Sequence, residues 1–337
     1  MSASPISVVL TAYNAERYIE EALDAILAQT VPADEVIVVD DGSTDATPAL
    51  LERFGGAIRV IRQDNRGHAA ALNRGMSEAR GEYLAKCDAD DIWELNKLER
   101  QLEALREHPE IDVAFSAITI FGRLTSSLSL TAVGDHSVGI LDGRRFARTL
   151  YGFNVVCPSS VLVRRSLYER IGPFAEHLAA EDYDYWFRCL AVGAVFYYDP
   201  TPLVRYRTHD GQITSNVMQM RWAGHEVRML HADLIGDPRF ARAVRTEDFF
   251  YIARLLVDEG RLEEARELFG RSVRSAPGIT GSAWRALAWF LILTLPASAR
   301  ERTGGMMIRC SRAIDRLLGV RQPVVPQPVV PRQPVVP

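Results

Sequence analysis

The sequence predicts an α/β protein with a mainly parallel, doubly wound sheet and a helical C-terminal extension. Over the first 120 residues, short apolar runs alternate with stretches that carry helical periodicity. Short strands that alternate with helices are typical of βαβ units, whose strands run parallel and are covered on both faces. Right-handed connections then place helices on both sides of the sheet. After His209 the pattern becomes predominantly helical.

The first half of the chain contains the regular part of this pattern. The predicted strands are Ile6–Leu10, Glu35–Asp40, Ile58–Arg62, Glu82–Cys87 and Asp112–Phe121. The predicted helices between them are about Glu16–Gln29, Asp45–Phe54, His68–Ala79 and Leu95–His108. Ligands of such sheets bind beyond the carboxyl ends of the strands. We therefore expect a site where polar clusters follow the strands, at 11–14, 40–43, 64–67 and 88–91.

The pattern is less regular from residue 122 to His209. It predicts a helix over Asp142–Tyr151, a strand over Val155–Val163, a helix entered through 178–188, and short strands at Val195–Tyr198 and Leu203–Tyr206. Residues 246–275 then resemble one hairpin of a helical-repeat protein, with the turn at Asp258–Arg261. Such a unit needs a neighbour to cover its apolar face.

The C-terminal region combines an apolar helix with many arginines. Ala283–Leu295 is strongly apolar but contains Arg285, and it is shorter than the roughly 20 residues that span a membrane. Arginines follow it, so either a membrane-surface helix pair or a pair that closes the core fits this pattern, and periodicity alone favours the second. The tail Gln322–Pro337 repeats Pro-Val-Val-Pro, which predicts an extended or disordered segment.

Composition narrows the class of protein. The 337 residues are 47% hydrophobic, which excludes global disorder, and the net charge of −4 lacks the basic excess of a dedicated nucleic-acid binder. The four cysteines have no zinc-ligand spacing, which favours reduced thiols. No basic segment followed by an apolar run stands at the N-terminus, so we expect a cytoplasmic protein.

Two carboxylate clusters follow predicted strands. Asp88 and Asp90 stand two residues apart and can converge on Mg²⁺ or Mn²⁺, with diphosphate oxygens completing the shell. The alternative is a polar loop that caps the next helix. Asp41 can accept the N3–H of a uracil or thymine ring, and the alternative there is a tight turn with a helix cap.

Six motifs occur in an order that resembles family 2 glycosyltransferases of the GT-A fold, a Rossmann-like fold. They are Val8-Val-Leu-Thr-Ala-Tyr-Asn14, Val38-Val-Asp-Asp-Gly-Ser-Thr-Asp45, Asn65-Arg-Gly67 with Asn73, Tyr83-Leu-Ala-Lys-Cys-Asp-Ala-Asp-Asp91, Glu181-Asp-Tyr-Asp-Tyr-Trp-Phe-Arg188 and Arg205-Tyr-Arg-Thr-His209. The resemblance covers about residues 4–215.

The resemblance implies inverting transfer of a sugar from a nucleoside diphosphate, with UDP or dTDP favoured, to a saccharide or lipid-linked hydroxyl acceptor. It divides one domain into a nucleotide-sugar half (1–120) and an acceptor and catalytic half (121–215), before a helical region (216–321) and the tail (322–337). The implied nucleotide-binding residues are Thr11, Ala12, Tyr13, Asp41, Arg66, Asp88 and Ala89.

The resemblance also implies a metal site and a catalytic base. Asp90, His209 and Asp88 are the implied ligands of Mn²⁺ or Mg²⁺, although His209 also fits an ordinary surface residue. Asp182 is the implied general base, supported by Glu181. A helix start at Asp182 would lower the pKa of its carboxyl group and burial would raise it, and the sequence leaves the sign open.

Departures from the family pattern refine the function. Gln219-Met-Arg-Trp222 is one residue short of the QxxRW motif of processive synthases, which favours a single-addition enzyme in cell-surface polysaccharide or glycoconjugate synthesis. We also expect peripheral membrane contact through 283–321, at the inner face. Two alternatives remain open: a haloacid-dehalogenase-like phosphatase, because Asp88–Ile92 resembles its nucleophile motif, and a non-catalytic sugar-nucleotide-binding or scaffold protein.

Overall fold

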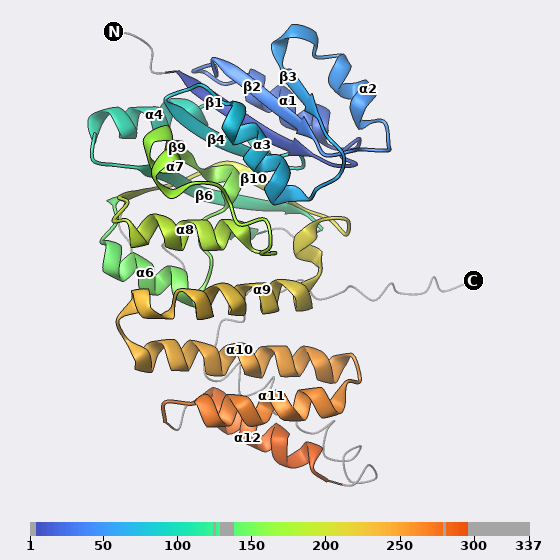
Figure 1. Ribbon diagram of the computed structural model, residues 1–337, viewed down its shortest axis with the longest axis vertical. Helices are drawn as coiled ribbons and strands as arrows, with labels where there is room; N and C mark the ends of the chain where they lie inside the picture. The colour runs from blue at the N-terminus through green and yellow to red at the C-terminus, as the bar shows by residue number, and fades with distance from the viewer. Residues whose placement is uncertain (1–4, 124–125, 129–137, 279–280, 296–337) are drawn as a thin grey trace, which may run out of the picture. The chain divides into compact units, whose positions relative to one another are not determined.

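The computed structural model describes residues 5–123, 126–128, 138–278 and 281–295. Figure 1 shows these residues as labelled helices and strands. Contacts within the chain divide it into two compact units. The first comprises residues 1–215 and 223–238, and the second comprises 216–222 and 239–337. The predicted tail 322–337 and the arginine-rich segment after Leu295 lie outside the described residues.

The N-terminal half of the first unit is a parallel sheet, as the sequence predicts. Its strands are β1 (Ile6–Ala12), β2 (Glu35–Asp40), β3 (Arg59–Arg62) and β4 (Tyr83–Asp88), in the order β3-β2-β1-β4. Every residue of β1 is buried, because helices cover both of its faces. Such two-sided burial is the reason why these strands read as continuous apolar runs.

The other half of the sheet is mixed. The order continues through β9 (Leu162–Arg164), β6 (Val113–Gly122) and β10 (Phe196–Thr208) to β5 (Ile92–Trp93). Here β6 and β10 are parallel, whereas β9 runs antiparallel to both β4 and β6. Two further strands, β7 (Ser126–Leu128) and β8 (Gly139–Ile140), pair with β6 and β10.

Two strand predictions in this half need correction. The strand expected over Val155–Val163 is a 3-10 turn at Pro158–Ser160 followed by the short strand β9, because Pro158 cannot donate to a ladder and the Ser160 amide bonds back to Cys157. The two strands expected at Val195–Tyr198 and Leu203–Tyr206 form one strand, β10, whose register shifts around Pro202.

The helices between the first strands lie on opposite faces of the sheet. α1 (Ile19–Leu27), α2 (Thr47–Glu52) and α4 (Lys97–Glu107) share one core with the even-numbered side chains of β1. α3 (His68–Glu78) covers the opposite face, where a Cβ atom on Gly75 would lie 2.4 Å from the side chain of Val9. The sheet is therefore doubly wound, and the glycine allows α3 to approach β1 closely.

The remaining α-helices of the first unit lie between the strands of the mixed half, before β9 or before β10. They are α6 (Gly143–Gly152), α7 (Arg165–Ile171) and α8 (Glu181–Ala191), with short 3-10 turns at Gly55–Ala57, Ile213–Ser215 and Ala232–Ile235. α6 confirms the predicted helix at Asp142–Tyr151, and Asp142 caps it by accepting a bond from the amide of Arg145. α9 (Val217–Leu230) contributes residues to both units.

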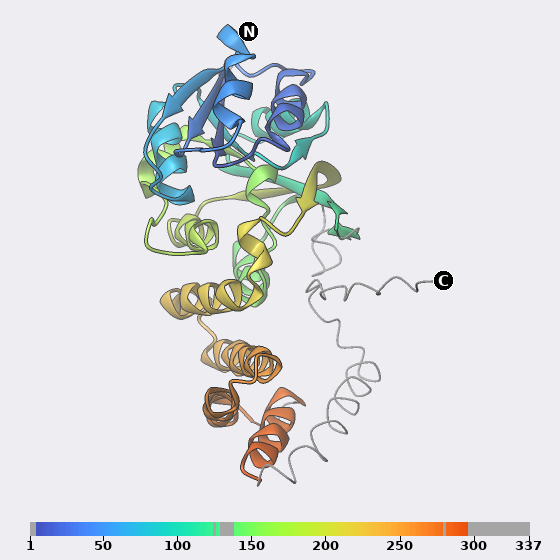
Figure 2. The same ribbon diagram turned by 90° about the vertical axis from the view of Figure 1, so that its right-hand side faces the viewer.

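In the described part of the second unit, successive helices share a core of their own (Figure 2). α10 (Pro238–Asp258) and α11 (Leu262–Ser275) form the predicted hairpin, and α12 (Gly281–Leu293) follows. Phe250, Phe269 and Trp289 are buried in this core, where the rings of Phe269 and Trp289 stack with centroids 5.8 Å apart. In the described part of the chain, no helix is both long and apolar enough to cross a bilayer.

Candidate functional site

The carboxyl ends of β1, β2 and β4 bring the first, second and fourth of the six motifs together. Thr11 of β1 pairs with Val39 on one side and with Asp88 on the other, and Ala12 pairs with Asp40. The Thr11 hydroxyl is buried without a hydrogen-bond partner in the described chain, whereas Tyr13 is 53% exposed. A buried unpaired hydroxyl beside an exposed aromatic ring suits a site that is completed by a ligand.

Asp41 forms hydrogen bonds with the loop 63–67, which leads into α3. Its Oδ1 accepts bonds from Gln63 Nε2 (2.7 Å) and the Arg66 amide (2.9 Å), and its Oδ2 accepts one from the Gly67 amide (2.9 Å). The carboxylate is buried and can accept one further bond. The alternative expected for Asp41, a turn with a cap of the following helix, does not describe these bonds, because they go to the loop before α3 and not to the start of α2. The Arg66 side chain is largely exposed.

Asp88 lies between two cations at the end of β4. Lys86 Nζ is 3.0 Å from Asp88 Oδ1, His68 Nε2 is 3.3 Å from the same oxygen, and the Ser159 hydroxyl donates to Oδ2. Burial opposes ionisation of Asp88, but Lys86 and His68 outweigh it and hold its pKa well below the usual range. The same ion pair raises the pKa of the buried Lys86.

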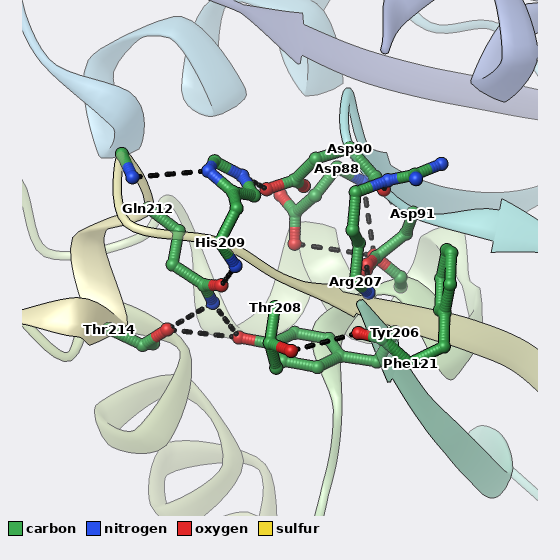
Figure 3. Close-up of polar contacts among 12 residues, drawn as sticks. Asp88, Asp90, Asp91, Phe121, Tyr206, Arg207, Thr208, His209, Gln212 and Thr214 are labelled. Carbon is green, nitrogen blue, oxygen red and sulfur yellow. Dashed lines mark hydrogen bonds and ion pairs between the residues drawn. The ribbon is translucent and has the colours of Figure 1, made fainter. Parts of the chain in front are cut away.

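Asp90 faces His209, as Figure 3 shows, with its Oδ2 atom 2.9 Å from the imidazole Nε2. Burial and the nearby charge of Asp88 raise the pKa of Asp90. The structure therefore brings together two of the three predicted metal ligands. It does not group Asp88 with them, and no cluster of three or more metal-ligating side chains occurs among the described residues.

The loop after β4 also contains a residue that the sequence reasoning missed. Asp91 is fully buried, and its Oδ1 accepts a bond from the Arg207 amide (3.0 Å). The Arg207 guanidinium in turn donates to the Asp90 carbonyl (2.9 Å) and lies over the ring of Phe121. These bonds join the Asp88–Asp91 turn to the end of β10 (Figure 3). His209 directly follows β10, so the same bonds place it close to Asp90.

The second acidic pair lies at the start of α8. The Glu181 carboxylate is 2.7 Å from His68 Nδ1. Burial raises the pKa of Glu181, but the bond to His68 outweighs it, and the pKa is lowered. Asp182 Oδ2 accepts a bond from Asn154 Nδ2 (3.0 Å). Burial and the charge of Glu181 raise the pKa of Asp182 to about 6, which settles the sign that the sequence left open.

His68 connects the two acidic clusters. Burial and Lys86 oppose its protonation, but the bonds to Asp88 and Glu181 prevail and raise its pKa to about 9. A titratable residue directly after the Asn65-Arg-Gly67 motif was a signal available in the sequence. Asn154 and Ser159 had no such signal, because only the fold brings the irregular segment 153–161 to the ends of β4 and α8.

The acidic cluster lies at the carboxyl edge of an open α/β sheet, where ligands of such sheets bind, and the second acid pair lies near it. The chain belongs to glycosyl transferase family 2, whose family model matches residues 7–172. An uncharacterized glycosyltransferase of Rickettsia typhi is 31% identical over 242 residues, which cover 68% of this chain and 74% of the relative.

The fold is shared with solved structures, among them two in complex with a nucleotide sugar. Staphylococcus aureus TarS 1–349, in complex with UDP-GlcNAc, is 20% identical with a TM-score of 0.61, covering 89% of this chain and 92% of that one. The mannosyltransferase PcManGT of Pyrobaculum calidifontis, in complex with GDP-Man and Mn²⁺, is 22% identical with a TM-score of 0.53, covering 93% and 87%. The expected GT-A fold and glycosyltransferase activity are confirmed, and the phosphatase and non-catalytic alternatives lose their support.

Proposed function

We propose that this glycosyltransferase moves a sugar from a UDP or dTDP donor to a hydroxyl acceptor, with inversion of the anomeric carbon. It would add a single sugar and would not extend a polymer processively. The observation that carries the proposal is the separation of two acidic groups with different electrostatics. Asp88 is held ionised by neighbouring cations, whereas Asp182 has a pKa of about 6 and can take up a proton near neutral pH.

The donor half of the site is assigned to the strand ends. Thr11, Ala12, Tyr13 and Asp41 would hold the base, with Arg66 beside it, and Asp88 and Ala89 would face the ribose. The last acceptor position of the Asp41 carboxylate suits the single N3–H of uracil or thymine. Guanine presents two neighbouring donors, N1–H and the 2-amino group, and one acceptor position would leave one of them unpaired. This preference separates the proposed donor from the GDP-Man that PcManGT binds.

Asp90 and His209 suit a divalent cation. A carboxylate oxygen and an imidazole nitrogen face each other at 2.9 Å, and Mn²⁺ accepts both kinds of donor atom. Two protein ligands are enough where phosphate oxygens of the substrate complete the shell. Ligation through Nε2 requires the ring proton on Nδ1, so His209 would give up the 3.2 Å bond that Nδ1 accepts from the Gly211 amide. When bound, the cation would offset charge on the leaving diphosphate.

Asp182 would act on the acceptor. A sugar hydroxyl is a weak nucleophile, so a carboxylate must accept its proton as the oxygen attacks the anomeric carbon. Attack from the face opposite the diphosphate inverts that carbon. Glu181, whose bond to His68 keeps it ionised, would support Asp182 by raising the affinity of its carboxylate for the proton.

A phosphatase mechanism would need Asp88 as a free nucleophile. Its two oxygens are instead engaged by Lys86, His68 and Ser159. An attacking oxygen of Asp88 would have to leave one of these partners.

Nucleotide sugars test the donor proposal directly. UDP-GlcNAc, UDP-glucose, a dTDP-hexose and GDP-mannose are compared by thermal shift and by released nucleoside diphosphate, with Mn²⁺ and with EDTA. A donor at 100 Kd should stabilise the protein by about 2.7 kcal/mol. We expect stabilisation and release with uridine or thymidine donors in Mn²⁺. A preference for GDP-mannose, or equal release in EDTA, would contradict the assignment.

We also propose that the enzyme works at the inner face of a membrane, which it contacts through 283–321. The sequence of the second unit contains 17 arginines and 9 acidic residues, although the whole chain has a net charge of −4. On α12, Trp284 and Leu291 are 58% and 54% exposed and stand seven residues apart, on one side of the helix. Exposed apolar side chains in a basic unit suit a surface of anionic lipid.

Vesicle sedimentation tests this contact. The full chain should sediment with phosphatidylglycerol vesicles and much less with phosphatidylcholine vesicles. Leu291→Ser should weaken the binding, and Leu95→Ser should not, although Leu95 is also exposed, at 58%. Equal binding of both vesicles, or no effect of Leu291→Ser, would show that something other than lipid covers α12.

A further inference from the structure

His68 contacts both acidic clusters of the site through its two ring nitrogens. It is the first residue of α3, entered through Gly67 with a φ of +91°. Nδ1 lies 2.7 Å from Glu181 Oε1, and Nε2 lies 3.3 Å from Asp88 Oδ1. The two carboxylates come from the start of α8 and the end of β4. One imidazole thus spans residues that are 93 positions apart in the sequence.

The Asp88 side of this contact is rigid without His68. Lys86 Nζ holds the carboxylate at 3.0 Å, the Ser159 hydroxyl donates to it at 3.2 Å, and its own amide donates back to the Ser159 oxygen. Losing His68 therefore removes one of several contacts that fix Asp88. The donor side of the site should tolerate the change.

The Glu181 side depends on His68 much more. Among the described residues, His68 is the one side chain that forms a hydrogen bond with the Glu181 carboxylate. The next residue, Asp182, is directed elsewhere by Asn154, at 3.0 Å. Without His68, the Glu181 carboxylate would be free to turn and to compete with Asp182 for Asn154 or for the acceptor hydroxyl. Each of the two adjacent carboxylates thus has a donor of its own, His68 for Glu181 and Asn154 for Asp182.

We infer that His68 is a positioning residue, which holds Glu181 on the Asp88 side so that Asp182 alone faces the acceptor. This inference rests on the proposed role of Asp182 as the base. In the proposed mechanism, His68 touches neither the nucleotide nor the acceptor. It acts by fixing the start of α8, where a small displacement of the base can cost much of the rate.

Kinetics of three variants test the inference. We expect His68→Leu to lower kcat for release of UDP from the best UDP-sugar of the donor panel by about tenfold, with the Kd of UDP within about twofold of wild type. His68→Gln keeps a donor and should recover part of the rate. In the double variant with Glu181→Gln the losses should not add, because both changes break the same contact.

His231→Leu is the matched control. His231 Nε2 is 2.8 Å from Asp184 Oδ1, so this variant also removes a histidine–carboxylate contact from α8, three residues beyond Glu181. It should lower the melting temperature without the fall in kcat. Equal kinetic effects of the two variants, or an unchanged kcat in His68→Leu, would reduce His68 to a structural residue and overturn the inference. A raised Kd for UDP with unchanged kcat would move His68 to the donor site and also overturn it.

The contact itself can be observed without turnover. In protein labelled with ¹⁵N-histidine, the hydrogen-bonded ring proton of His68, assigned by its loss in His68→Gln, should change in Glu181→Gln and persist in His231→Leu. A proton that Glu181→Gln leaves unchanged would overturn the inference. If wild type releases no nucleotide from any donor, the proposed function fails. If wild type turns over and His68→Leu matches it, only the role of His68 fails.

Discussion

Replacing Asp182 with asparagine removes the proposed proton acceptor while keeping the size of the side chain. Its bond from Asn154 Nδ2 can still be accepted by the amide oxygen, so the local structure should survive. We expect kcat to fall by at least about 10²-fold, the low end for losing a general base, with little change in donor affinity. Glu181→Gln should be the milder change.

The pH dependence of wild type gives a second measure of the same group. With a pKa of about 6, Asp182 is about nine tenths ionised at pH 7 and about one tenth ionised at pH 5, so kcat/KM should fall about tenfold between these values. An unperturbed aspartate would keep most of the rate to near pH 4. Asn154→Ala should shift this acid limb to higher pH, because the bond it removes favours the ionised carboxylate.

Stability should change in the opposite direction from activity. A carboxyl group whose pKa is raised on folding favours the folded state at low pH, and this contribution is lost as the pH rises through about 6. At pH 7.5, Asp182→Asn should therefore unfold at a higher urea concentration than wild type, with a free energy of unfolding that is larger by at most about 3 kcal/mol. This difference should disappear near pH 4. Near-wild-type kcat in Asp182→Asn, or a wild-type acid limb near pH 4, would refute the assignment of the base.

Three further changes have expected outcomes. Gly75→Ala should lower the free energy of unfolding by about 1–3 kcal/mol in urea titrations, because the new Cβ would meet Val9, whereas Gly143→Ala, with open space around it, should be nearly neutral. Burial lowers the pKa of Lys97 to about 7, so wild type should gain stability relative to Lys97→Met as the pH rises from 7 toward 10, and parallel pH curves would contradict this. Asp90→Ala should abolish the stimulation of nucleotide release by Mn²⁺ and leave the melting temperature nearly unchanged, and full activity of the variant would remove the metal mechanism.

The parallel half of the fold could be predicted from the sequence because burial there is simple. Strands covered on both faces read as apolar runs, and β2, predicted at Glu35–Asp40, has those bounds in the structure. The mixed half of the sheet is harder to predict from the sequence. Its strand β9 has three residues, and β10 passes through Pro202 with shifts of register, so neither has a clear period.

The candidate site divides in the same way. Residues that follow strands, such as Asp41 and Asp90, could be found by their place in the pattern. The contacts that set their chemistry could not. Lys86 reads as an interruption of an apolar strand, yet it forms the ion pair that keeps Asp88 charged. Asn154 belongs to an irregular segment, and only the tertiary fold brings it to Asp182.

A crystal of the enzyme grown with UDP and Mn²⁺ would test the donor and metal assignments together, because the anomalous signal of manganese locates the cation independently of any assay. We expect one manganese peak ligated by Asp90 and His209 and by the diphosphate, with the uracil ring beside Tyr13 and Asp41 at the carboxyl ends of β1 and β2. UDP bound away from this edge of the sheet, or manganese bound elsewhere while Asp90 and His209 remain paired with each other, would contradict these assignments.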